Sequence, residues 1–338
     1  MYWIALMHLA KSVFLLALTV CLASTVAQTA PPATPPPQED SEDVTIKIDV
    51  DLVNVFCSVR DKYGRFITNL TQDNFDLFDQ KKPQEIRYFS LVKDLPLTIG
   101  LLVDVSKSQE NLIEVEREAA YAFFRDVLRK KDMAFLISFG ADTDLLQDMT
   151  NSPELLRAGL KELRLNAGAQ PVLTPGTVPT IGSPKGTLLY EALYLAAQDK
   201  LRHEIGRKVL IVITDGVDMG SRISESEAIK EAQKADAIIY SILYYDPRYQ
   251  MGFGSSGAGT LKKMSEDTGG RMFEVSRKHP LKEVFDLIQE EMRSQYLLGY
   301  AATNSEKDGS FHEIEIKTKP EKLKVQARKG YFAVKSVE

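Results

Sequence analysis

The stretch Leu97–Ser108 (LTIGLLVDVSKS) constrains the fold of this chain more than any other. It is a continuous apolar run that ends in the polar segment Asp104–Ser108 (DVSKS). Such a run is typical of a strand that is buried on both faces inside a parallel sheet. In open α/β sheets, ligands bind beyond the carboxyl ends of these strands. The carboxylate of Asp104 and the hydroxyls of Ser106 and Ser108 are hard oxygen donors, which favour Mg²⁺, Ca²⁺ or Mn²⁺ over a soft metal.

Residues 1–27 have the pattern of a secretory signal peptide. An apolar run, Val13–Val20, is followed by small residues up to Ala27, after which cleavage is expected. The run is too short to span a bilayer comfortably, so we expect no transmembrane span after cleavage. Two alternatives stay open, a retained N-terminal anchor and a lipid on Cys21. The sequence therefore predicts export, to the periplasm, the cell envelope or the medium.

The composition narrows the range of partners. Without residues 1–27 the chain has 41 Lys and Arg against 47 Asp and Glu, a formal charge of −6. A mildly acidic chain without a basic stripe is not expected to bind nucleic acid. Cys57 is then the one cysteine left, so a disulfide within the chain and a cysteine-based metal site are both excluded.

A β module is predicted on either side of the central region. Residues 28–43 are rich in proline and then acidic, which is typical of an unfolded tether. Residues 44–94 alternate with period two and predict an antiparallel β module, and period two returns in residues 296–338. The N-terminal module has roughly fifty residues, which is few for an independent sandwich, so we expect the C-terminal strands to complete it. The predicted strands are Thr45–Arg60, Phe75–Asp79, Ile86–Ser90, Tyr296–Ala301, Phe311–Thr318, Lys322–Ala327 and Tyr331–Val334, with a polar turn at Gln80–Pro83.

Residues 95–295 alternate between strand-like and helix-like segments. This alternation predicts an α/β domain, a doubly wound and mainly parallel sheet with helices on both faces. After Leu97–Asp104, the predicted strands are Met133–Phe139, Asp144–Met149 at an edge, Lys208–Thr214, Ala237–Tyr245 and Arg271–Val275. The predicted helices are Leu112–Leu128, Leu155–Leu163, Thr187–Leu201, Ser224–Asp236, Gly259–Thr268 and Leu281–Gln295.

Polar residues from three distant segments are expected to meet at one edge of this sheet. Asp104, Ser106 and Ser108 follow one strand, Asp215 follows another, and Thr187 begins a helix after the long loop 166–186. Because the carboxyl ends of parallel strands share one edge, these side chains should lie close together. Asp218, three residues beyond Asp215, could be an acid that supports the metal ligands or a solvated turn residue, and we expect the second.

The three segments resemble the metal-ion-dependent adhesion site (MIDAS) of von Willebrand factor type A (VWA) domains. From about residue 44 to 334 the chain is similar to bacterial VWFA-related proteins of the acidobacterial type, including the flanking segments Asp61–Phe75, Arg293–Tyr300 and Ala327–Phe332. The resemblance implies a Rossmann-like VWA domain, inserted in or flanked by an Ig-like β-sandwich. It also implies a metal site formed by Asp104, Ser106, Ser108, Thr187 and Asp215.

The resemblance further implies metal-bridged protein binding and not catalysis. Mg²⁺, or else Mn²⁺ or Ca²⁺, would accept an Asp or Glu carboxylate from a protein ligand. Possible partner contacts are Tyr249, Met251 and Phe253 in the loop 246–257.

Other interpretations of the same residues stay open. Asp104 and the two serines could be caps at a strand end, and Thr187 could cap its helix. Asp104 could also be the nucleophile of a Mg²⁺-dependent phosphotransferase or hydrolase, although Ser106 stands where such an enzyme has a second acid. A third alternative is a structural envelope protein whose metal stabilises the fold alone.

Overall fold

The computed structural model describes residues 52–92, 95–166, 186–246, 248, 256–303, 307–319 and 322–333. The signal peptide, the tether and the first part of the strand predicted at Thr45–Arg60 lie outside the described residues. The described residues all belong to one compact unit, residues 49–338. Across these ranges, no helix combines the length and the apolar character that a membrane span requires.

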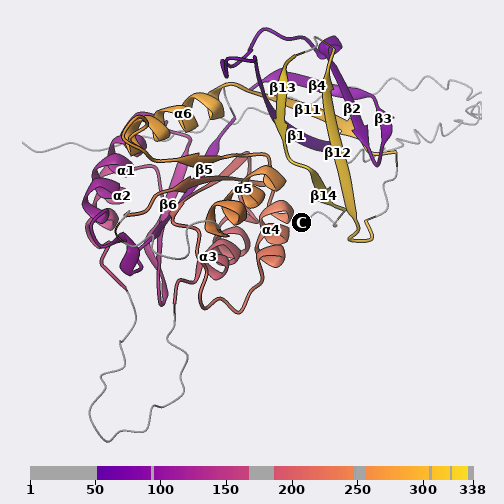
Figure 1. The fold of residues 1–338 in the computed structure, drawn as a ribbon. Coiled ribbons are helices and arrows are strands. Elements are labelled where there is room, and N and C mark those ends of the chain that lie inside the picture. Colours follow the sequence, from indigo (N-terminus) through magenta and orange to yellow (C-terminus); the bar gives the residue numbers. More distant parts are fainter. Residues whose placement is uncertain are drawn as a thin grey trace, which may run out of the picture. The chain divides into compact units, whose positions relative to one another are not determined.

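A six-stranded sheet forms the centre of the α/β domain, in the order β10-β9-β8-β5-β6-β7 (Figure 1). Every residue of the central strand β5 (Leu97–Asp104) is buried, as the apolar run predicts. β5 pairs in parallel with β8 (Arg207–Thr214) on one side and with β6 (Met133–Phe139) on the other. At one edge, β7 (Thr143–Thr150) pairs with β6 in the antiparallel direction. β9 (Ala237–Leu243) and β10 (Met272–Glu274) complete the sheet, which confirms the predicted doubly wound, mainly parallel architecture.

Helices cover both faces of this sheet (Figure 1). Alternate residues of β5 enter different cores, so Leu101 packs in the core on one face and Leu102 in the core on the other. The first core includes α1 (Ile113–Val127), α2 (Pro153–Lys161) and α6 (Leu281–Arg293), and the second includes α3 (Leu189–Leu195), α4 (Glu225–Lys234) and α5 (Ser256–Thr268). The continuous apolar pattern of β5 is therefore required by burial on both sides.

Several element boundaries differ from the prediction. α6 ends at Arg293, two residues earlier than predicted. Gln295 already belongs to the following strand and pairs there with Ser58 of the first strand. The predicted turn Gln80–Pro83 is shorter, since Lys82–Gln84 forms the edge strand β3, where a proline is tolerated. The predicted helix Thr187–Leu201 consists of α3 and the π-helical turn η3 (Ala196–Leu201).

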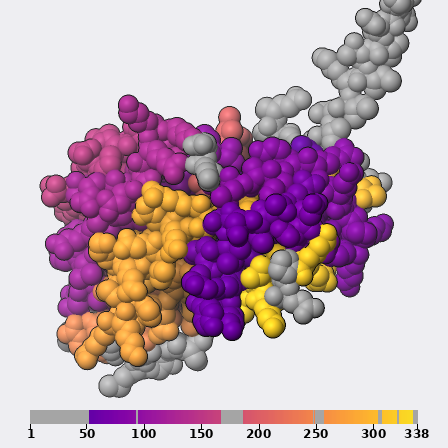
Figure 2. Space-filling view, turned by 90° about the horizontal axis from the view of Figure 1, so that it is seen from above, coloured from indigo at the N-terminus to yellow at the C-terminus, as the bar shows by residue number. Residues whose placement is uncertain are grey.

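The strands before and after the α/β domain pair with one another. β1 (Leu52–Arg60) pairs with β11 (Gln295–Ala301), and β2 (Phe75–Asp79) pairs with β12 (Phe311–Thr318). Two four-stranded antiparallel sheets result, in the orders β13-β1-β11-β4 and β14-β12-β2-β3. The remaining strands are β4 (Ile86–Leu91), β13 (Lys324–Ala327) and β14 (Gly330–Phe332). Figure 2 shows the early, indigo residues next to the late, yellow ones, and the expected joint β-sandwich is confirmed.

A buried carboxylate links the two sheets of the sandwich. Asp79 on β2 is 4% exposed, and its Oδ2 accepts hydrogen bonds from Tyr300 at 2.9 Å and from Tyr331 at 3.2 Å. Its Oδ1 lies 3.3 Å from Nδ1 of the buried His312. Tyr300 belongs to the other sheet, so Asp79 joins N-terminal and C-terminal strands through hydrogen bonds to buried groups.

We predict that Asp79→Ala destabilises the fold by about 3 kcal/mol, because buried tyrosine hydroxyls would lose their acceptor. Chemical denaturation followed by circular dichroism measures the free energy of unfolding. Asp76→Ala is the matched control, since Asp76 is an exposed carboxylate on the same strand. Equal stability of the two variants would contradict the structural role of Asp79.

Candidate metal centre

The segment after β5 turns at the carboxyl edge of the sheet. Asp104 is fully buried, and its Oδ1 accepts a hydrogen bond from the backbone N–H of Ser106 at 2.8 Å. Its Oδ2 accepts a 2.6 Å hydrogen bond from the hydroxyl of Thr214, the last residue of the neighbouring strand β8. The parallel pairing of β5 with β8 makes this contact possible, since it brings the two strand ends side by side.

Four of the five predicted metal ligands come together here. The hydroxyl of Ser108 donates a 2.7 Å hydrogen bond to Oδ2 of Asp215, and it lies 3.1 Å from the hydroxyl of Ser106. Oδ1 of Asp215 accepts a hydrogen bond from the backbone N–H of Val217 at 3.0 Å. The oxygens of Asp104, Ser106, Ser108 and Asp215 thus form one connected cluster from two strand ends.

Thr187 is held at the same edge by backbone contacts. Leu188 donates its N–H to the carbonyl of Gly140 at 3.0 Å, and Gly140 directly follows β6, the neighbour of β5. Met219 donates its N–H to the carbonyl of Thr187 at 3.0 Å. The Thr187 side chain is buried, and among the described contacts its hydroxyl makes no hydrogen bond to the other four predicted ligands.

Two positioning residues were missed by the sequence analysis, and the expectation for a third needs correction. Thr214 holds Asp104, and the fully buried Gln109 donates from Nε2 to the carbonyl of Tyr244 at 3.1 Å, which anchors the turn to the end of β9. Asp218 is not a merely solvated turn residue, because its carboxylate accepts hydrogen bonds from the Tyr190 backbone and from Ser221. The Asp-x-x-Ser spacing is a turn signal that could have identified this last role.

The electrostatics of the cluster favour a cation. Burial, and then the negative charge of Asp215, raise the pKa of Asp104 to about 7, against the opposing effect of hydrogen bonds from Thr214 and Ser106. Lys107, between the two serines, is half-exposed, and its ammonium group pairs with Glu110 at 2.5 Å. A divalent cation would relieve the repulsion between the two carboxylates.

The donor chemistry fits a hard cation and not a soft one. Within the ranges that the structure describes, no group of three or more His, Cys, Asp or Glu side chains is arranged to hold a metal. The candidate set differs from such groups, because it combines two carboxylates with neutral hydroxyls, the oxygen ligands that Mg²⁺, Mn²⁺ and Ca²⁺ accept. The predicted partner contacts Tyr249, Met251 and Phe253 lie outside the described residues.

The sheet order, with one antiparallel edge strand, and the meeting of the Asp104, Thr187 and Asp215 segments at one edge decide the fold type. The α/β domain has the von Willebrand factor type A fold. No family model and no curated protein matches the chain.

Several solved structures are similar to this chain in fold. BatB from Bacteroides thetaiotaomicron is 18% identical with a TM-score of 0.42, covering 58% of this chain and 97% of its own. An aerotolerance-related membrane protein from Bacteroides fragilis is 15% identical with a TM-score of 0.41, covering 58% and 98%. Proximal thread matrix protein 1 from the mussel byssus, with a zinc-occupied MIDAS motif, is 11% identical with a TM-score of 0.47, covering 64% and 50%.

A second carboxylate of the type A domain lies buried near the cluster. Glu116 on α1 is fully buried, and neither of its carboxylate oxygens has a hydrogen-bond partner in the described part of the chain. Burial, and then the charge of Asp104, raise the pKa of Glu116 well above its ordinary value. The native state therefore favours the protonated form of Glu116, whereas in the unfolded chain this carboxyl ionises above about pH 4.3.

We predict that Glu116→Gln raises the melting temperature at pH 8 and that this gain shrinks toward pH 5. The unfolded wild type binds fewer protons than the native state above about pH 4.3, so its stability falls by up to about 1.4 kcal/mol per pH unit from this group. A glutamine has no such dependence. Thermal unfolding in EDTA between pH 5 and 8 tests this, with the exposed Glu118→Gln on the same helix as control. An identical pH dependence in both variants would refute it.

Proposed function

We propose that this protein binds a protein partner through a divalent cation held by Asp104, Ser106, Ser108, Thr187 and Asp215. The observation that carries the proposal is the cluster of two carboxylates and two hydroxyls at the carboxyl edge of the sheet. When bound, Mg²⁺, Mn²⁺ or Ca²⁺ would supply positive charge and a coordination position for an Asp or Glu carboxylate of the partner.

The hydroxyls of the cluster explain why the partner should be anionic. Ser106 and Ser108 contribute neutral oxygens, so Asp104 and Asp215 are the two negative charges of the described cluster. Thr214 and the Ser106 backbone already occupy both carboxylate oxygens of Asp104 with hydrogen bonds. The two carboxylates balance a dication without an excess of negative charge, and the hydroxyls add none, so an open coordination position can accept one more carboxylate from outside.

Binding without turnover is part of the proposal. A phosphotransferase built on Asp104 would need a general acid close to it, and the position two residues later is Ser106. We also propose that the protein acts outside the cytoplasm of a bacterial cell, on the signal-peptide pattern of residues 1–27.

The first test is calorimetric titration of Mg²⁺ and of Mn²⁺ into the protein. We expect binding of one ion per chain, and a rise in stability of about 2.7 kcal/mol at a metal concentration one hundred times the dissociation constant. Asp104→Ala should abolish both the heat and the stabilisation, because the cluster loses a negative charge.

Asp286→Ala is the matched control, because Asp286 is an exposed carboxylate on α6 that pairs with Lys282. Its metal binding should equal that of the wild type. The proposal would be refuted if the wild-type protein gave neither heat nor stabilisation with either ion. If Asp104→Ala bound the metal as tightly as the wild type, the metal site would not be the one proposed.

The second test uses a random peptide library displayed on phage and selected on the protein in Mg²⁺. We expect the selected peptides to share an Asp or Glu whose change to Asn or Gln weakens binding about tenfold or more, since a charge-assisted contact is lost. EDTA should have a similar effect, and excess Mg²⁺ should reverse it.

The same peptides are measured against Asp104→Ala and Asp286→Ala. Peptides that bind equally in EDTA would indicate a metal with a structural role alone. Release of inorganic phosphate from a phosphate ester, lost in Asp104→Asn, would instead favour the enzyme alternative.

A further inference from the structure

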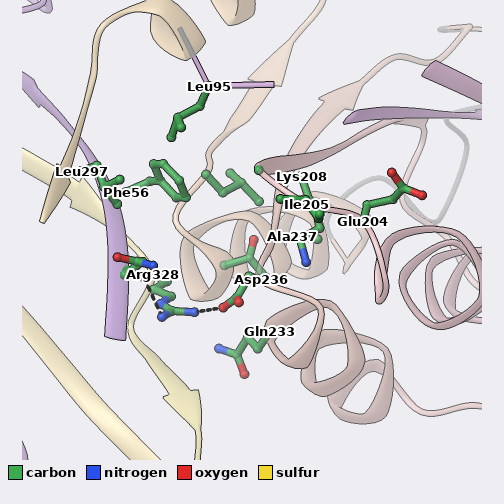
Figure 3. Close-up of a pocket in the computed structure, with 14 residues that line it drawn as sticks. Phe56, Leu95, Glu204, Ile205, Lys208, Gln233, Asp236, Ala237, Leu297 and Arg328 are labelled. Atoms are coloured by element: carbon green, nitrogen blue, oxygen red, sulfur yellow. Dashed lines mark hydrogen bonds and ion pairs between the residues drawn. The ribbon is translucent and has the colours of Figure 1, made fainter. Parts of the chain in front are cut away.

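A second cleft lies at the amino edge of the central sheet, opposite the metal cluster. It has a volume of about 370 Å³ and is formed where the first residues of β8 and β9 meet strands β1 and β11 of the sandwich (Figure 3). Its volume lies within the range of small-molecule sites in proteins, and those sites are mostly apolar with a few placed polar groups. The apolar lining includes Phe56, Leu95, Ile205, Ile238 and Leu297.

The cleft contains a largely buried lysine whose ammonium group has no contacting anion among the described residues. Lys208, the second residue of β8, is 8% exposed and lines the cleft. In the part of the chain that the structure describes, its side chain makes no hydrogen bond or ion pair. Figure 3 shows the carboxylate of Glu204 turned away from the cleft, so it does not cap the ammonium group.

Two further charges of the cleft, on Arg328 and Asp236, are matched to each other. Arg328 pairs through Nη1 with Oδ1 of Asp236 and donates from Nη2 to the carbonyl of Asn54 at 2.8 Å (Figure 3). Its Nε is buried without a hydrogen-bond partner among the described residues. Arg328 already compensates Asp236, and the carboxylate of Glu204 points away from the cleft, so the ammonium group of Lys208 is left without a contacting anion among the described residues.

A buried cation without a paired anion is unfavourable. Burial lowers the pKa of Lys208, while Asp236 and Glu204 act on it in the opposite direction through space. An anion that entered the cleft would remove this cost, and its apolar part would displace water from the aromatic and aliphatic walls.

We propose that this cleft binds a small amphipathic carboxylate, with the anionic head at Lys208 and the apolar body against Phe56, Ile205 and Leu297. The site is separate from the metal cluster, because it lies at the opposite ends of the same strands. It does not depend on the function proposed above.

Isothermal titration of 4-phenylbutyrate into the full chain tests the site, with 4-phenylbutanol as the neutral analogue of the same shape. We expect the acid to bind at one site per chain, with a dissociation constant of about 10 mM or lower for a ligand of this size. Lys208→Met should weaken the acid about tenfold or more and leave the alcohol unchanged, because a charge-assisted contact is lost.

Two further variants locate the site. Ile205 lines the cleft and its side chain is 85% exposed, so Ile205→Trp should not unfold the protein. The larger side chain should obstruct the cleft and weaken the binding of both ligands. Lys282→Met removes an exposed lysine of α6 and should bind like the wild type. EDTA should have no effect on any of these titrations.

Three results would overturn the proposal. One is the absence of binding of the acid to the wild type up to about 10 mM. The others are equal binding of the acid by a folded Lys208→Met variant, and equal affinity of the wild type for the acid and the alcohol.

Discussion

Two carboxylates, Asp104 and Asp215, are held together at the carboxyl edge of the sheet. The repulsion between their negative charges is the constraint on which the site depends. The pairing of β5 with β8 fixes it, because it places Thr214 next to Asp104. Ser108 then bonds to Asp215 across the two strand ends. Hydrogen bonds hold the like charges in place but do not neutralise them, so the fold itself creates a position for a cation.

The sandwich places a second constraint on the type A domain, because both ends of that domain enter it. β4 leads into β5, and α6 leads into β11, which pairs with β1 and β4. Glu291 of α6 is fully buried, lies 2.7 Å from Nε of Arg271 and accepts a 3.2 Å hydrogen bond from Ser58 of β1. A displacement of α6 along the sheet would have to break this buried contact or move β1 with it.

Structure that follows from a local pattern was predictable from the sequence. The apolar run of β5 and the alternating strands predicted the sheets, and parallel topology predicted that Asp104 and Asp215 would meet. Roles set by tertiary contacts were not predictable in this way. Gln109 reaches a carbonyl of β9, and Asp79 joins strands from both ends of the chain. The predicted end of α6 was wrong for the same reason, because Gln295 pairs with Ser58 on the distant strand β1.

The metal cluster and the amino-edge cleft occupy opposite ends of the same strands, and the sheet between them limits how they can influence each other. Eight residues of extended strand span about 26 Å, and the side chains along β5 and β8 are buried in close-packed cores. Close packing of this kind resists rearrangement, which disfavours transmission of a signal through the sheet. The sandwich is different, because its strand β1 reaches both places. Phe56 of β1 lines the cleft together with Leu297 of β11, and Ser58 of β1 contacts α6. Coupling between the two sites, where it exists, would therefore run around the sheet through β1 and α6 and not through its core.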